Sequence, residues 1–291
     1  MDLQIEEFDS KIREIIPEKA KLEQIATGFG FTEGPIWCGD YLLFSDIPRN
    51  RIVHLQIHSY GPEITTFRFP SGNSNGLTLD RSGRLIACEH STRRVTCTEL
   101  DGSIRVLADR YQERRLNSPN DVVVRSDGSI FFTDPPFGLR DFHQRKEVLS
   151  NGVYRIAPDG DLMLLLNDFN MPNGLAFSPD ETILYVDDTA QRHIRAFDVS
   201  LDGSISNGRV FIEMKLPEAG VPDGMKVDLQ GNVYCTGPGG IWIMEPGGKF
   251  LGRILMPELT ANFAWGDSDS KTLYITAHTS IYRLRLAAQG I

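Results

Sequence analysis

Six polar residues recur at the start of six similar sequence segments, and their side chains could together hold a hard metal ion. They are Glu33, Asn75, Asn120, Asn173, Asp223 and Asn262. Every one carries a side-chain oxygen, and carboxylate and carboxamide oxygens are the ligands that calcium takes in proteins. The set contains no His or Cys, which speaks against zinc or copper. If the six face one axis, a bound cation relieves the cost of burying them together.

Local backbone geometry offers an alternative explanation for each position taken alone. Asn-Gly and Asp-Gly pairs form turns, and Asn is common at the start of a strand. Six such residues in register, among them Glu33, which is a poor turn former, favour a binding site instead. Because water and substrate can complete a coordination shell, four protein ligands are enough, and the case is weakest for Asn75 and Asn262.

The segments that carry these residues repeat one template of two short apolar strands joined by a tight turn. Their starts are separated by 42, 45, 53, 50 and 39 residues, a period that suits one four-stranded propeller blade. The apolar runs are short, rich in Val, Ile, Phe and Tyr, and broken by Asp-Gly, Ser-Gly or Pro-Asp, as in strands rather than helices. The sequence therefore predicts an all-β fold, a six-bladed β-propeller with a central metal-binding channel, over residues 21–291.

The two ends of the chain supply strands that the repeats leave over. We expect residues 21–29 (KLEQIATGF) and 280–286 (SIYRLRL) to pair within one blade, which closes the ring and removes an exposed sheet edge. Residues 1–20 form an N-terminal extension outside the repeats, with a short amphipathic helix around SKIREII.

The second strand of each hairpin returns to the face from which the first one leaves, so its end should border the same channel mouth. These ends are Asp46, Glu89, His90, Thr133, Asp134, Asp187, Asp188, Thr236, Ala277 and His278. A mouth with a cation, carboxylates and two histidines is a reasonable small-molecule pocket. The predicted substrate-binding residues are Asn75, His90, Asn117, Asn120, Asp134 and His278. Each His could equally be a solvated loop residue, and Asp134 before Pro135-Pro136 could simply cap a rigid loop.

Composition narrows the partners and the compartment. The formal charge is −9 and the pI about 5.2, which argues against nucleic acid or an anionic membrane as partner. No apolar stretch is long enough to span a bilayer, and the N-terminus lacks a signal-peptide pattern, so we expect a cytoplasmic protein. Cys88 and Cys97 could meet across a hairpin, but reduced thiols are expected for all four cysteines in a domain of this size.

Several segments of the chain resemble segments of one known protein family. They are FTEGPIW (31–37), NSPNDVVVRSDGSIFFTDPPFGL (117–139), MPNGLAFSPD (171–180), VPDGMKVD (221–228) and TLYITA (272–277). In this order they resemble the regucalcin (senescence marker protein)/gluconolactonase family over almost the whole chain from about residue 20. The combination of NSPND with FTDPP looks like its bacterial gluconolactonase branch.

The resemblance implies one divalent cation in the channel, usually calcium, with zinc, manganese and magnesium as alternatives. By motif match its ligands would be Glu33, Asn173 and Asp223, while Asn120 matches a position that binds metal in some members and substrate in others. The residue that matches Asp223 is also proposed as the general base in the family. Ser118 stands where animal members have Arg, so their substrate contacts cannot be carried over at that position.

These observations predict a lactonase that opens a small cyclic ester such as a sugar lactone. The cation would polarise the carbonyl while water attacks, and Asp223 would take the proton from that water, with His90 as the alternative base. No GxSxG elbow is visible, which argues against a covalent acyl-enzyme. Two alternatives stay open: a phosphotriesterase or aryl-ester hydrolase on the same metal site, and a non-catalytic calcium-binding propeller. We expect a monomer or a homodimer.

Overall fold

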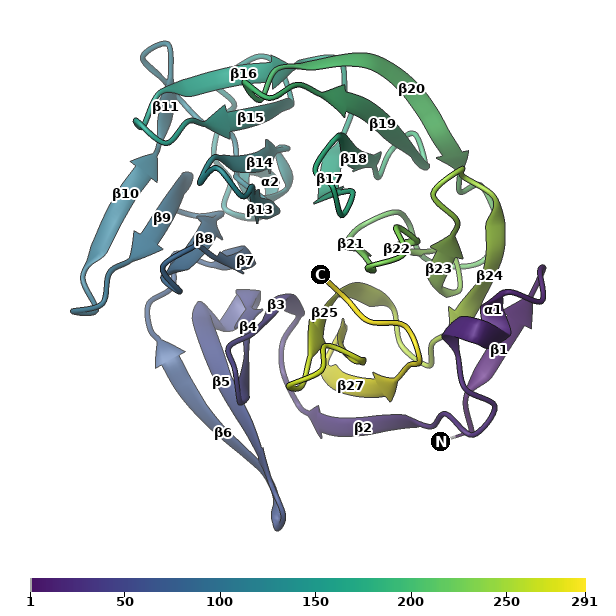
Figure 1. Cartoon of the computed structure of the whole chain (residues 1–291). Coiled ribbons are helices and arrows are strands. Elements are labelled where there is room, and N and C mark those ends of the chain that lie inside the picture. The colour runs from purple at the N-terminus through teal and green to yellow at the C-terminus, as the bar shows by residue number, and fades with distance from the viewer. Residues whose placement is uncertain (1) are drawn as a thin grey trace.

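The fold is a ring of six antiparallel sheets around a central axis, as a computed structural model of the chain shows (Figure 1). It describes residues 2–291. Each sheet is one blade built on four strands, with the first strand innermost, and blade 5 has a fifth strand at its outer edge. Blade 1 contains β3 (Thr32–Trp37), β4 (Tyr41–Asp46), β5 (Arg51–His58) and β6 (Gly61–Arg68). Blade 2 contains β7 (Ser74–Leu79), β8 (Leu85–Glu89), β9 (Arg94–Thr98) and β10 (Ile104–Ala108).

Blades 3 and 4 follow in the same order around the ring (Figure 1). Blade 3 contains β13 (Val122–Val124), β14 (Ile130–Asp134), β15 (Gly152–Ile156) and β16 (Leu162–Leu166). A small hairpin of β11 (Arg110–Tyr111) and β12 (Arg114–Arg115) precedes it, and the one-turn helix α2 (Phe137–Asp141) follows β14. Blade 4 contains β17 (Pro172–Phe177), β18 (Ile183–Asp188), β19 (His193–Val199) and β20 (Ile205–Glu213).

Blades 5 and 6 complete the ring, and the predicted six-bladed propeller is confirmed. Blade 5 contains β21 (Met225–Val227), β22 (Val233–Gly237), β23 (Gly240–Met244) and β24 (Phe250–Leu255). Blade 6 contains β25 (Thr260–Gly266), β26 (Thr272–Ala277), β27 (Ser280–Arg285) and, from the other end of the chain, β2 (Leu22–Thr27). The innermost strands contact one another in the order β3, β7, β13, β17, β21 and β25, and β25 contacts β3 again.

The expected closure between the chain ends is confirmed as well. Strand β2 pairs antiparallel with β27, with Leu22 opposite Leu284 and Thr27 opposite Ser280. In Figure 1 the purple strand β2 lies beside the yellow β27. Blade 6 therefore joins both ends of the chain, so the ring cannot open without breaking this pairing.

The N-terminal extension is attached more firmly than the sequence indicated. The expected short helix is present as α1 (Ile12–Ile15), and its Ile12 and Ile15 are buried in the core cluster of blades 5 and 6. Strand β1 (Gln4–Glu7), which was not predicted, pairs with β24 as a fifth strand of blade 5. The reason is that Gln4–Glu7 lies outside the repeated template, so the repeat offered no register for it.

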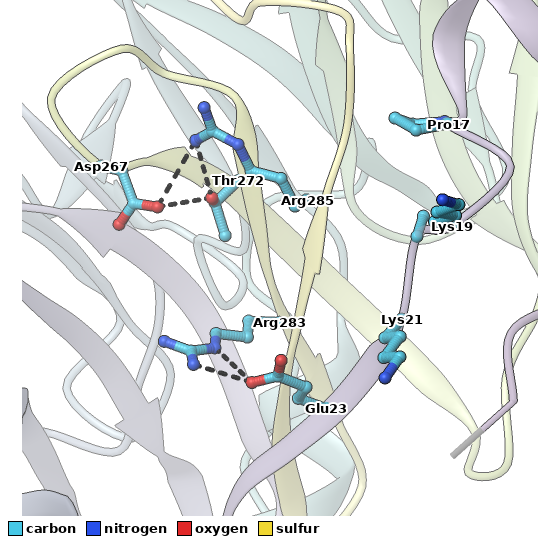
Figure 2. A pocket seen from close by; sticks show the side chains of 9 residues that line it. Pro17, Lys19, Lys21, Glu23, Asp267, Thr272, Arg283 and Arg285 are labelled. Carbon is cyan, nitrogen blue, oxygen red and sulfur yellow. Dashed lines mark hydrogen bonds and ion pairs between the residues drawn. The ribbon is translucent and has the colours of Figure 1, made fainter.

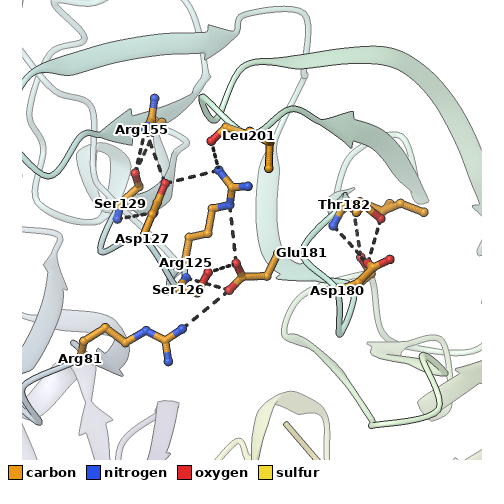
Figure 3. Close-up of polar contacts among 12 residues, drawn as sticks. Arg81, Arg125, Ser126, Asp127, Ser129, Arg155, Asp180, Glu181, Thr182 and Leu201 are labelled. Carbon is orange, nitrogen blue, oxygen red and sulfur yellow. Dashed lines mark hydrogen bonds and ion pairs between the residues drawn. The ribbon is translucent and has the colours of Figure 1, made fainter.

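Polar contacts tie neighbouring blades together at the hairpin turns, on the face away from the six opening residues. Glu181 accepts a hydrogen bond from the Ser126 backbone N–H (2.7 Å), and its carboxylate lies 3.6 Å from Arg125 Nε and 3.9 Å from the Arg81 guanidinium. Arg125 also donates to the carbonyl of Leu201 (3.2 Å) (Figure 3). These contacts link the turns of blades 2, 3 and 4.

All four cysteines are free thiols within the described chain; Cys88 lies opposite Val95 and Cys97 opposite Ile86, so the two thiols do not face each other. Across residues 2–291, the helices are all too short and too polar to traverse a bilayer.

Weakening the closure of blade 6 should lower the stability of the whole ring. We expect Leu22→Ala to lower the free energy of unfolding by about 2–5 kcal/mol, because it opens a cavity in a buried position between β2 and β27. The adjacent exposed Lys21→Ala serves as the control. Denaturant unfolding measures both, and equal midpoints for the two variants would contradict the importance of this closure.

Candidate functional site

The structure brings the six opening residues together at one end of the channel. Asn75 Nδ2 donates to Asn120 Oδ1, and Asn120 Nδ2 donates to Asn173 Oδ1 at 2.5 Å. Asn173 is hydrogen-bonded in turn to the carboxylate of Asp223. On the other side of the ring, Asn262 is hydrogen-bonded to the carboxylate of Glu33. The side chains that the repeat register placed on one axis therefore do meet there, and their roles stay a prediction.

Glycines make this close approach possible. In four blades the opening residue is followed by Gly, and a Cβ added there would collide with the next blade. On Gly34 it would lie 2.0 Å from the Asn75 carbonyl oxygen, and on Gly174 2.0 Å from that of Asp223. The Asn-Gly and Asp-Gly pairs thus serve packing at the axis in addition to the turn geometry that the sequence suggested.

Hydroxyl and thiol groups fix four blades to their neighbours just beside the ring. In these blades the penultimate residue of the second strand donates to a backbone carbonyl at the start of the next blade. The donors are Ser45 (to Asn75), Cys88 (to Asp121), Thr133 (to Asn173) and Thr236 (to Ala261). Blade 4 carries Asp187 at this position, and in blade 6 Thr276 donates to Asn262 of its own blade.

Two carboxylates that were not assigned to the site lie against the ring. Asp121 occupies the position that is Gly in four blades, and its side chain is hydrogen-bonded to Asn262. Asp187, which was expected at the rim, is instead fully buried, where it accepts from the Gly174 N–H. Asp121 Oδ2 and Asp187 Oδ1 have no hydrogen-bond partner among the described residues. Asp121 and Asp187 both differ from the residues that the other blades carry at the same repeat positions, and this difference in the sequence could have indicated them.

Burial and mutual repulsion make these carboxylates hard to ionise. Burial, together with the charge of Asp121, raises the pKa of Glu33 from 4.5 to about 7. Burial and the charges of Glu33 and Asp187 raise the pKa of Asp223 well above its usual range. The pKa of Asp187 is raised in the same way by burial and by Asp121. Four acidic groups thus share one enclosed region, and placing them there costs free energy unless positive charge compensates them.

The arrangement fits a hard divalent cation. The ring offers only oxygen donors, and Asn75 Oδ1, like the two orphaned carboxylate oxygens, has no partner among the residues described. Within residues 2–291 there is no group of three or more His, Cys, Asp or Glu side chains disposed around a metal position. A set of two carboxylates and two carboxamides, such as Glu33, Asp223, Asn120 and Asn173, is compatible with that finding, because half of its donors are amides.

His90 lies beneath α2 and contacts the ring. Its Nε2 is 3.1 Å from Asn120 Oδ1, and burial lowers the pKa of the imidazole to about 4. The helix is held by Ser118, whose Oγ accepts from the Gly138 N–H (2.9 Å), and a Cβ on Gly138 would lie 2.6 Å from His90 Cβ. His90 is therefore enclosed and neutral near pH 7, and it is placed to orient the amide of Asn120.

The other predicted substrate residues have different surroundings. Asn117 and Asp134 are fully buried: the Asn117 N–H donates to Asp134 Oδ2 (2.7 Å), and Asn117 Nδ2 donates to the Ser150 carbonyl (2.9 Å). These contacts hold the connection between β14 and β15 in place. His278 is exposed, and its ring packs edge-to-face on Phe31 at 5.9 Å, next to the start of β3.

A charged pocket on the outside of blade 6 is separate from this site. It has a volume of about 430 Å³ and lies between the N-terminal extension and β27 (Figure 2). Its guanidinium groups are already paired, Arg283 with Glu23 (2.7 Å) and Arg285 with Asp267 (3.7 Å). The remaining cations, Lys19 and Lys21, are exposed, and the hydroxyl of the buried Thr272 already donates to Asp267.

Comparisons with known proteins agree with the propeller fold and show the family. Residues 31–279 match the family described as SMP-30/Gluconolactonase/LRE-like region. The chain is 33% identical to a gluconolactonase of Zymomonas mobilis over 98% of this chain and 87% of that protein. It is 30% identical to a pentonolactonase of Haloferax volcanii over 84% of this chain and 80% of that one.

A solved structure with the same fold is a gluconolactonase of Xanthomonas campestris. It superposes with a TM-score of 0.89 at 34% identity, over 98% of this chain and 95% of that one. The likeness therefore includes both the sequence and the arrangement of the blades, across nearly the full length of the two chains.

The raised pKa of Glu33 predicts how stability depends on pH without a cation. Because folded Glu33 holds its proton up to about pH 7 while the unfolded residue releases it near 4.5, the folded state is the better proton binder between these values. Stability of chelator-treated protein should therefore fall as pH rises from about 5 to 7. Glu33→Gln should reduce this slope, measured as Tm against pH. Some slope should remain, because burial also raises the pKa of Asp134 to about 7. An unchanged slope in the variant would contradict the burial of an ionisable Glu33.

Proposed function

The chain belongs to the SMP-30/Gluconolactonase/LRE-like family, and on this premise we propose that it is a lactonase that opens a sugar lactone with the help of one divalent cation. The observation that carries the proposal is the ring of oxygen ligands at one end of the channel, with unpartnered oxygens and mutually repelling carboxylates. The similarity to a gluconolactonase and a pentonolactonase supports a cyclic sugar ester as substrate class.

Four ring residues would hold the cation. Glu33 and Asp223 supply the negative charge, and Asn120 and Asn173 supply carboxamide oxygens, a set that suits calcium, with zinc, manganese or magnesium as alternatives. When bound, the cation supplies Lewis-acid polarisation of the lactone carbonyl. His90 fixes Asn120 through its hydrogen bond, so that the carboxamide keeps one orientation.

Asp223 is the best-placed general base. It is half-buried, whereas Glu33, Asp121 and Asp187 are buried, so it is the most solvent-exposed residue among these four acids. We assign it the proton of the attacking water as the water oxygen bonds to the carbonyl carbon. The ring C–O bond then breaks, and the alcohol oxygen that leaves takes up the proton, which yields the open hydroxy acid.

The mouth offers groups suited to a polyhydroxylated substrate. Asn75 Oδ1 is buried without a partner among the described residues and can accept a hydrogen bond from a substrate hydroxyl. His278 with Phe31 lies beside β3 at the rim. Asn117 and Asp134 would act at a distance, by holding the loop that carries α2 over His90. Hydrolysis assays with a lactone, with a phosphotriester and with an aryl ester distinguish this function from a phosphotriesterase or aryl-ester hydrolase and from a non-catalytic propeller.

Hydrolysis of glucono-1,5-lactone should depend on the cation and on the ring. We expect activity in a pH-stat assay to disappear with chelator and to return with calcium. Asp223→Asn should lower kcat by about 100-fold or more, because it removes the base. Glu33→Gln should raise the calcium concentration needed for half-maximal rate. Glu63→Gln, an exposed Glu on β6, is the matched control. Full activity of Asp223→Asn, or hydrolysis of paraoxon or phenyl acetate but not the lactone, would contradict the proposal.

A second variant separates the two candidate bases. Because burial lowers the pKa of His90 to about 4 and its Nε2 faces Asn120, we expect His90→Gln, which keeps a polar group there, to retain activity within about tenfold of the wild type. Its main effect should be on the calcium requirement. A loss as large as that of Asp223→Asn, at saturating calcium, would instead identify His90 as the base.

A further inference from the structure

One basic side chain, Lys226, lies in the wall of the channel close to the carboxylates. It belongs to the short inner strand β21, three residues after Asp223. Its Nζ donates to the Asn262 Oδ1 (3.2 Å) and to the Met225 carbonyl (2.9 Å), and it sits 6.0 Å from the centre of the Phe263 ring. The equivalent positions of the other blades are uncharged: Ile36, Thr78, Val123, Ala176 and Trp265.

The partner of Lys226 connects it to the acidic groups. The Asn262 side chain that accepts the hydrogen bond from Lys226 is also hydrogen-bonded to Glu33 and to Asp121. The ammonium opposes the rise in pKa of both carboxyls, and for Asp121 it is the largest opposing influence. The single ammonium of Lys226 therefore faces four carboxyl groups, those of Glu33, Asp121, Asp187 and Asp223. One positive charge cannot balance the negative charge that these four groups carry when they are ionised.

From this placement we propose that Lys226 is a built-in countercharge that sets the affinity of the ring for its divalent cation. The inference rests on the proposed function, because it concerns the same cation. Lys226 acts on the ring through Asn262 and through its field, so it is a positioning residue rather than a catalytic one. A fixed positive charge beside the ring stabilises the fold before a cation binds, and it repels the cation that arrives.

These two effects distinguish a countercharge from a residue that only fills space. Loss of packing lowers the stability of the cation-free and cation-loaded protein alike. Loss of the countercharge lowers the stability of the cation-free protein, in which the carboxylates then repel one another unopposed. It also strengthens binding of the cation, which becomes the main positive charge in the channel. The gain in Tm on adding calcium must therefore be larger without Lys226.

The test compares Lys226→Met with the wild type, both stripped with chelator. Titration calorimetry with calcium chloride gives Kd, and thermal unfolding gives Tm without and with saturating calcium. We expect Lys226→Met to bind calcium about tenfold more tightly, to melt lower when stripped, and to gain more in Tm from calcium than the wild type. Neither readout requires turnover.

Two control variants isolate the charge. Lys226→Arg keeps it and should match the wild-type Kd within about threefold. Val123→Ala, at the equivalent position of blade 3, removes packing only; it should lower both Tm values equally and leave Kd unchanged. An unchanged Kd in Lys226→Met, or equal changes in Lys226→Met and Lys226→Arg, would overturn the inference.

The remaining outcomes are also decisive. If stripped Lys226→Met does not fold but refolds with calcium, the countercharge role is supported; if it does not fold with calcium either, the residue is structural and the inference fails. A folded wild type that shows neither binding heat nor a Tm change with calcium, manganese, zinc or magnesium would refute the proposed cation function, and this inference with it. A wild type that binds while Lys226→Met binds equally would refute this inference alone.

Discussion

The feature on which the rest of the structure depends is the concentration of buried carboxylates at one end of the channel axis. Glu33, Asp121, Asp187 and Asp223 repel one another there, and burial deprives them of the water that would screen them. Such a cluster persists only if the surrounding chain cannot move apart. The closed ring supplies that rigidity, because β2 and β27 join the two ends of the chain in one blade.

The detailed packing near the axis follows from the same constraint. Glycines after the opening residues let the backbone of one blade approach the next to distances that any Cβ would prevent. Four hydroxyl or thiol donors then tie the second strand of their blade to the following blade. The positions that hold the ring together are thus the ones that bring the side-chain oxygens of the opening residues close. The same repeated sequence pattern produces both the propeller and the cluster of opening residues, so both could be predicted from that pattern.

The repeat also explains how far the sequence could go. Positions that obey the template were predictable: the six opening residues, the strand order within blades and the closure by residues 21–29. Residues that depart from it were not. Asp121 replaces a glycine, Asp187 replaces a hydroxyl donor, and Lys226 replaces an uncharged wall residue, and all three gather at the ring. Strand β1 was missed because it has no counterpart in any repeat.

At the rim, the sequence was less informative for another reason. The strand order predicts where a residue lies along a blade, but it does not predict what the side chain of that residue contacts. Asn117 and Asp134 sit at the predicted level, yet the Asp134 carboxylate accepts from the Asn117 backbone N–H and the Asn117 side chain donates to the loop before β15. His278, at a similar level, is exposed. A long connection such as residues 135–151 folds back over the blade and buries polar groups that a bare propeller would expose. The repeat, which is shared among the blades, therefore determines which polar groups line the channel. Individual loops determine how far a small molecule can reach those groups. Preference among lactones of different ring size should accordingly reside in the loop around α2 rather than in the six opening residues.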